Sequence, residues 1–183
     1  WGKDSIGNYS FATGFNTRAN GSFSTALGNS TIAHGFYSTA IGFNTTAWGE
    51  TSTAMGYFSQ AGNRATAIGY YTNAGGNYSI AIGNSTTANG EVSTAIGHNT
   101  TSSGDYSTAM GYFSQANGNY STALGNSSAA SGNSSTAMGN STIASGQSST
   151  AMGRQTTASG LQSTAMGFLT TASGDYSTAM GNF

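Results

Sequence analysis

The chain contains no cysteine and no proline, and only four basic and five acidic residues are found among its 183 positions. The absence of cysteine excludes a disulfide framework, a thiolate metal site and a cysteine nucleophile. A formal net charge of -1 removes the electrostatic footprint of a nucleic-acid-binding protein. Apolar runs are very short throughout, so no segment predicts a membrane-spanning helix.

Large aliphatic residues are also scarce. Leu, Ile, Val and Phe together make up only a small fraction of the chain, too little for an ordinary globular core. Disorder usually requires a high net charge as well, and this chain is almost neutral. We therefore expect a regular backbone, rather than a large apolar core, to organise the chain.

Glycine is abundant and strictly phased. A unit of the form Ser-Thr-Ala-aliphatic-Gly ends at Gly14, Gly28, Gly42 and at ten later glycines, each fourteen positions after the last except for a single step of thirteen. A weaker Ala-x-Gly unit lies between successive copies. Coiled coils need large apolar seam residues, and collagen needs Gly at every third position together with proline. The pattern predicts a coil of short β-strands with glycine corners, in which each repeat forms one turn with two strands and two corners.

Strand side chains alternate between two faces, so each strand of a turn has an inward and an outward face. Ala and Ser of the first strand and Ala of the second strand are predicted to point inward. The residue before the first glycine then forms an outward aliphatic row: Leu27, Ile41, Met55, Ile68, Ile82, Ile96, Met110, Leu124, Met138, Met152, Met166 and Met180. The second strand is polar on its outer face. An uncovered row of this length predicts self-association, with like chains side by side, and the alternative is a wider monomeric coil that encloses the row.

One turn is a residue short. Residues 57–62 match residues 112–118 with the equivalent of Asn117 missing, so we expect a deletion beside a corner that leaves the aliphatic row in register.

The phased pattern, as in Ser121-Thr122-Ala123-Leu124-Gly125 followed by Ala130-Ser131-Gly132, resembles the head repeats of YadA-like trimeric autotransporter adhesins. The resemblance covers essentially all of residues 1–183, which we treat as a single head-repeat domain and as an excerpt of a longer fibre or adhesin. It implies an all-β, left-handed parallel β-roll (β-solenoid) of about 13 turns, assembled as an intertwined or side-by-side homotrimer. It also implies an extracellular position, either on a cell surface through an outer-membrane anchor outside this segment or on a fibre or virion surface. Such repeats also occur in phage-type tail fibres. The chain departs from the family in having Thr two positions before the row, where the family often has a β-branched aliphatic residue.

Little in the sequence favours catalysis. His34 and His98 lie far apart along the chain and neither recurs with a carboxylate, so we expect no enzyme activity, no metal site and no cofactor. Aromatic residues concentrate in the N-terminal half, many of them at corners. The simplest interpretation is that the rings stack between turns and chains. The alternative is that an exposed cluster contacts a ligand, and the candidate contacts are Trp48, Phe43, Tyr57, Phe36 and His34.

Three functions remain open. The leading one is a surface adhesin head or fibre shaft that attaches to host, prey or matrix surfaces. Its expected partners are sister copies of the chain and a protein or glycan of the target surface. We expect no nucleic-acid or membrane contact by this segment. The second is ice binding, because a flat solenoid can order water on regular threonine ranks such as Thr25, Thr39 and Thr53. The third is a structural spacer in a phage-type tail fibre.

Overall fold

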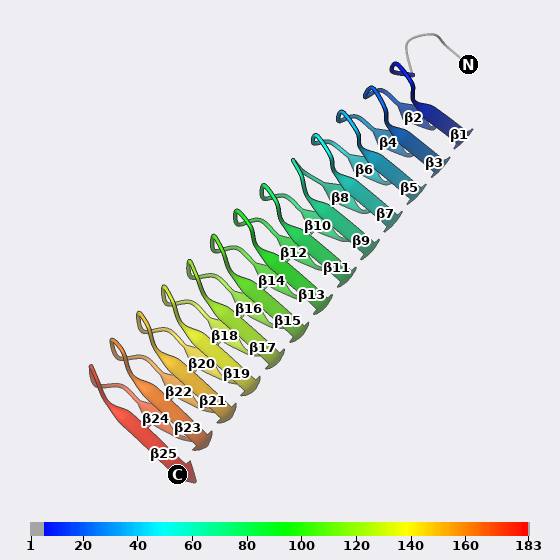
Figure 1. Ribbon diagram of the computed structural model, residues 1–183. Helices are drawn as coiled ribbons and strands as arrows, with labels where there is room; N and C mark the ends of the chain where they lie inside the picture. The colour runs from blue at the N-terminus through cyan, green and yellow to red at the C-terminus, as the bar shows by residue number, and fades with distance from the viewer. Residues whose placement is uncertain (1–5, 183) are drawn as a thin grey trace. The chain divides into compact units, whose positions relative to one another are not determined.

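The computed structural model describes residues 6–182, and β-strands are the only regular secondary structure among these residues. The backbone divides into two compact units, residues 1–92 and 93–183. In each unit a five-residue strand alternates with a two-residue strand, turn after turn (Figure 1). The fold is an all-β parallel β-solenoid of about 12 turns, close to the expected number.

The first unit contains two parallel sheets, one of long strands and one of short strands. Its long strands are β1 (Phe11–Phe15), β3 (Thr25–Asn29), β5 (Thr39–Phe43), β7 (Thr53–Tyr57), β9 (Thr66–Tyr70) and β11 (Ile80–Asn84). Its short strands are β2 (Arg18–Ala19), β4 (Ile32–Ala33), β6 (Thr46–Ala47), β8 (Gln60–Ala61), β10 (Asn73–Ala74) and β12 (Thr87–Ala88).

The second unit repeats this arrangement. Its long strands are β13 (Thr94–His98), β15 (Thr108–Tyr112), β17 (Thr122–Asn126), β19 (Thr136–Asn140), β21 (Thr150–Arg154), β23 (Thr164–Phe168) and β25 (Thr178–Asn182). Its short strands are β14 (Thr101–Ser102), β16 (Gln115–Ala116), β18 (Ala129–Ala130), β20 (Ile143–Ala144), β22 (Thr157–Ala158) and β24 (Thr171–Ala172). Each residue pairs with its equivalent one turn later, so the period predicted from the glycines is confirmed.

The interior of the coil is lined by small side chains. Ser24, just before the long strand β3, and Ala26 within it are buried, as are Thr31 and Ala33 on the short-strand side. Their equivalents in most later turns are buried too. The inward placement of Ser and Ala is thus confirmed. Because the two sheets face each other closely, only side chains of this size fit between them.

Some buried hydroxyl groups form hydrogen bonds within a turn or between turns. In several turns the serine before the long strand donates to the carbonyl oxygen of the glycine three residues earlier, as from Ser24 to Gly21 at 2.5 Å. The buried hydroxyls of Ser121, Ser135 and Ser149 have no hydrogen-bond partner within the described structure. Ser128, before β18, donates to the carbonyl of Gly139 in the next turn at 3.1 Å. The interior therefore gains part of its cohesion from hydrogen bonds in place of large apolar contacts.

Glycine is required where each long strand ends, because successive turns approach closely there. Gly28 has φ of +128°, and a Cβ atom at this position would lie 1.9 Å from the carbonyl oxygen of Gly42. The residue two positions after this glycine also has a left-handed backbone conformation but is not glycine, as at Ser30 with φ of 54°. Every described turn thus contains backbone conformations that L-residues adopt reluctantly.

The short turn keeps every strand in register. Met55 pairs with Ile68 on the long sheet, and Gln60 pairs with both Thr46 and Asn73 on the short sheet. The missing residue is absorbed between Ala61 and Ala65, in the corner that follows β8. The predicted effect of the deletion is therefore confirmed.

Candidate functional site

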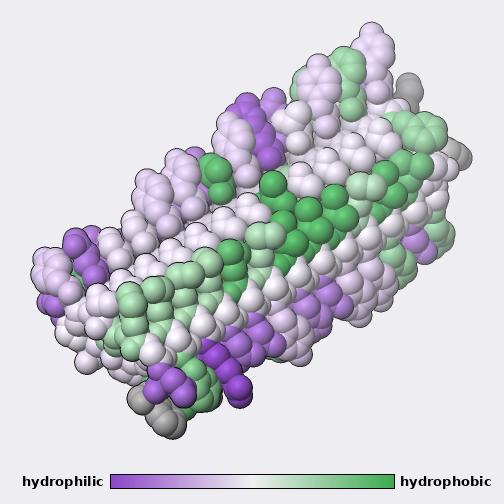
Figure 2. Space-filling model, turned by 60° about the horizontal axis from the view of Figure 1, so that its bottom comes forward, coloured by the Kyte–Doolittle hydropathy of each residue, from purple (hydrophilic) through white to green (hydrophobic). Residues whose placement is uncertain are grey.

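The aliphatic row lies on the outside of the coil in both units. It comprises Leu27, Ile41, Met55, Ile68 and Ile82 in the first unit, and Ile96, Met110, Leu124, Met138, Met152, Met166 and Met180 in the second. In each unit the row appears as a green band on the face shown in Figure 2. None of these side chains is buried; most are half-buried, and Met110 is 39% exposed. A wider coil that encloses the row is excluded, because the buried interior contains only Ala, Ser and Thr side chains.

Neighbouring row residues occupy equivalent positions on adjacent strands. Leu27 pairs in register with Ile41 in the first unit, and Met138 pairs with Met152 in the second. Contact along the row accounts for its partial burial, since residues in register on adjacent strands place their side chains side by side. The outer surface of each row has no protein cover in a single chain.

A threonine rank runs beside the aliphatic row on the same outer face. Thr25, Thr39 and Thr53 are half-buried and occupy one register position of the long sheet. The outer face of the short-strand side is more polar, as at Asn20, Ser103 and Asn117, which are all exposed. The contrast follows from the residues at the outward positions of the two strands, aliphatic and Thr on the long strand and polar beside the short one.

Five rings of the first unit form two stacked columns at the corner that follows the long strands. Phe43, Tyr57 and Tyr70 stack at centroid distances of 5.0 Å, with interplanar angles of 11° and 6°. Phe58 and Tyr71 form the second column at 4.9 Å, and rings of the two columns meet edge to face. We call these five residues the aromatic plate.

Other rings lie at the opposite corner, before the long strands. Tyr9, Phe23 and Tyr37 stack at 5.1 and 5.0 Å, and Phe36 meets Phe23 and Tyr37 edge to face. On the short-strand side, one residue beyond β4 and β6, His34 and Trp48 lie with their ring centroids 5.8 Å apart.

The five candidate ligand contacts therefore fall into two groups. Phe43 and Tyr57 belong to the aromatic plate, whereas Phe36, His34 and Trp48 lie near the other end of the long strands. Tyr70, Phe58 and Tyr71 complete the plate and were not among the candidates. Their shared position, one or two residues after a row glycine, is the sequence signal that groups them.

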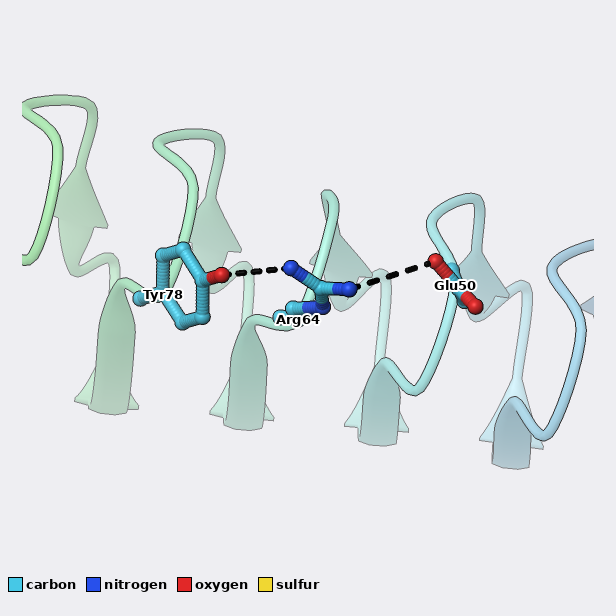
Figure 3. Close-up of polar contacts among 3 residues, drawn as sticks. All are labelled: Glu50, Arg64 and Tyr78. Atoms are coloured by element: carbon cyan, nitrogen blue, oxygen red, sulfur yellow. Dashed lines mark hydrogen bonds and ion pairs between the residues drawn. The ribbon is translucent and has the colours of Figure 1, made fainter.

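Stacking between turns also organises the few charged side chains. Arg64 lies between Glu50 and Tyr78, which are one turn before and one turn after it (Figure 3). Its guanidinium is 3.7 Å from the Glu50 carboxylate, donates to the Tyr78 hydroxyl and lies over the Tyr78 ring. Arg64 and Glu50 are about half exposed, so the pair adds little stability.

The structure gathers no set of metal-binding side chains in the range that it describes. No group of three or more His, Asp or Glu side chains is arranged to hold a metal ion among residues 6–182. His34 and His98 lie in different units, and each packs against a neighbouring ring, Trp48 and Tyr112 respectively. No helix able to cross a membrane is found in this same range.

Comparison with protein families identifies the repeat. The model for the YadA head domain repeat (2 copies) matches residues 5–31, 33–59, 61–86, 88–114, 102–128, 116–142, 130–156, 144–170 and 158–183. The chain belongs to the YadA head repeat family. The matches cover nearly every residue of both units, so the resemblance inferred from the glycine spacing is confirmed.

Membership of this family makes the chain an adhesin-like domain of the trimeric autotransporter type. No curated protein sequence matches the chain closely enough to add a relative to this assignment.

Proposed function

We propose that the chain is the head or shaft of a trimeric surface adhesin, in which three copies pack with their aliphatic rows together around a common axis. The observation that carries this proposal is the row itself, which lies outside the coil and has no cover in a single chain. The family is one of homotrimeric adhesins, which supports the number three. A binding and structural role, without catalysis, follows from the same family.

The energetics favour assembly through the row. The interior contains only small side chains, so each turn buries little apolar area of its own. Completing the burial of a half-covered Leu, Ile or Met contributes roughly 1 kcal/mol, and the contribution recurs in every turn. The exposed short-strand face has no such row, so the long-strand face is the one that sister chains cover.

We place the assembled head on the outside of a cell or of a fibre, where it attaches to a host, prey or matrix surface through a protein or glycan. Three identical chains would present each surface feature three times. Simultaneous engagement raises avidity well above the affinity of one contact, so individual contacts of modest strength are sufficient.

Mass in solution, measured by light scattering over a range of concentrations, tests the assembly. Three times the chain mass of 18.3 kDa is expected. Adhesion is tested with beads that carry the chain, applied to cell layers and to matrix-coated surfaces, and beads that carry an unrelated protein serve as the control. A stable, folded monomer refutes the proposal, and so does a trimer whose beads adhere no better than the control beads.

Ice binding is the second candidate, supported by the regular threonine rank of the long sheet. It needs the face that the proposed trimer covers, so the two functions exclude each other for this surface. A monomer that shows thermal hysteresis would establish ice binding. A trimer that shows neither adhesion nor thermal hysteresis would support the third function, a structural spacer.

A further inference from the structure

The rings of the aromatic plate remain partly exposed to solvent although they stack between turns. Phe43, Tyr57, Tyr70 and Tyr71 remain 41%, 38%, 47% and 48% exposed after stacking. The hydroxyl groups of Tyr57, Tyr70 and Tyr71 make no hydrogen bond within the described residues. Ring edges and three phenol hydroxyls therefore face solvent together.

The surroundings of the plate are neutral. At the same corner the preceding turn carries Asn29 and Ser30, and the following turn carries Asn84 and Ser85. In both pairs the serine hydroxyl donates to the asparagine side chain. No Asp, Glu, Lys or Arg occupies these two corner positions in any described turn of the first unit. A charged partner would have no counter-charge here, whereas amides, hydroxyls and aromatic rings suit a neutral polyhydroxyl partner.

The repeat of the plate adds a length scale. Successive rings of the longer column lie 5.0 Å apart, which is close to the length of one pyranose unit in an extended β-linked chain. A linear glycan that lies along the corner would place one sugar against each turn. Sugar hydroxyl oxygens would contact the exposed ring edges, and sugar hydroxyls would form hydrogen bonds with the Tyr hydroxyls and the flanking amides.

We propose that the aromatic plate binds an uncharged, extended, β-linked glycan. The inference rests on the proposed adhesin function, for which it names the ligand class. It also requires that the plate stay accessible in the assembled protein.

The repeat supplies substitutions that the backbone already accepts. Asn126-Ser127 and Asn140-Ser141 occupy the corresponding corner positions in the second unit, with Ser127 and Ser141 at positive φ. The plate variant is therefore Phe43→Asn, Tyr57→Asn, Phe58→Ser, Tyr70→Asn and Tyr71→Ser. A matched control removes rings from the opposite corner, through Phe36→Asn and Tyr37→Ser, the residue types found at Asn133 and Ser134.

The assay titrates the full assembled chain with cellohexaose and chitohexaose by calorimetry, and maltohexaose and a heparin hexasaccharide test linkage shape and charge. We expect saturable binding of a β-linked hexasaccharide, at least about tenfold weaker binding by the plate variant, and unchanged binding by the control variant. The solution mass of each variant is measured in parallel and is expected to match wild type.

Several outcomes would overturn the inference. In the binding assay these are no saturable binding of either β-linked hexasaccharide, equal binding by the plate variant, or a preference for heparin or maltohexaose. In the mass measurement it is loss of assembly by the plate variant, because the rings would then be contacts between protomers. A wild-type trimer that adheres to surfaces but binds neither β-linked hexasaccharide refutes the glycan and leaves the adhesin proposal standing. A monomeric wild-type chain refutes the trimer whatever the saccharides do.

Discussion

Met110→Asp should disrupt assembly of the chain. Met110 lies in the aliphatic row and is 39% exposed in the single chain. Covering that fraction of a methionine contributes roughly 1 kcal/mol, and the seven row residues of the second unit together contribute on the order of 7 kcal/mol per protomer. Burial of an aspartate costs several kcal/mol per ion, and threefold symmetry would bring three such charges together. The loss corresponds to at least about a thousandfold weaker association.

The assay for Met110→Asp is light scattering across a dilution series, with far-UV circular dichroism to follow folding. Met110→Ile is the conservative variant, because isoleucine occupies the same row position at Ile96, and it should assemble as wild type does. Asn117→Asp introduces the same charge in the same turn on the exposed short-strand side and should leave the mass unchanged. If Met110→Asp assembles as tightly as Asn117→Asp, the row is not the interface.

Three further changes test how the coil itself is held. Gly69→Ala should prevent folding, because the added Cβ would lie 1.9 Å from a backbone carbonyl oxygen of the next turn. Gly75→Ser is the control: its Cβ would meet only flexible side chains, so Tm should shift by a few degrees at most. Thr51→Asn should stabilise the fold by about 1 kcal/mol in chemical denaturation, because Thr51 has φ of 51° and asparagine tolerates that region better. The reverse change at an equivalent φ, Asn44→Thr, should destabilise the fold. A lower denaturation midpoint for Thr51→Asn would contradict this reasoning. Thr86→Val should stabilise the fold by roughly 1 kcal/mol, because the buried Thr86 hydroxyl has no hydrogen-bond partner within the described structure. A destabilised variant would show that this hydroxyl forms a hydrogen bond in solution.

Much of the fold could be predicted because the chain is periodic. Recurrence of glycine at every fourteenth position fixes the length of a turn, and the alternation of side chains in a strand separates the inward Ala and Ser from the outward row. The register across the short turn was predictable for the same reason, since a slip of one residue from the pairing of Met55 with Ile68 would move the row to the other face of the sheet. The inward column that contains Thr31 and Thr86 was not identified, although it lies two residues before the inward alanines and so shares their face.

The candidate ligand contacts were less predictable. Nearness along the chain grouped Trp48 with Phe43 and Tyr57, but the corners place Phe43 and Tyr57 at one end of the long strands and Trp48 near the other. Residues at equivalent positions of adjacent turns are the true neighbours, as Phe43, Tyr57 and Tyr70 show. A corner aromatic acquires its partners from the turns above and below it, so its surface depends on stacking between turns.

The sequence by itself determined the period, the parallel pairing, the small interior and the position of the aliphatic row, because these depend only on backbone geometry and on which residues recur. The tertiary structure decided which rings stack, which hydroxyls are satisfied and which corners accept left-handed residues other than glycine. Those features depend on side-chain orientation and on the local path of the backbone between strands, and two turns must be in contact before either is fixed.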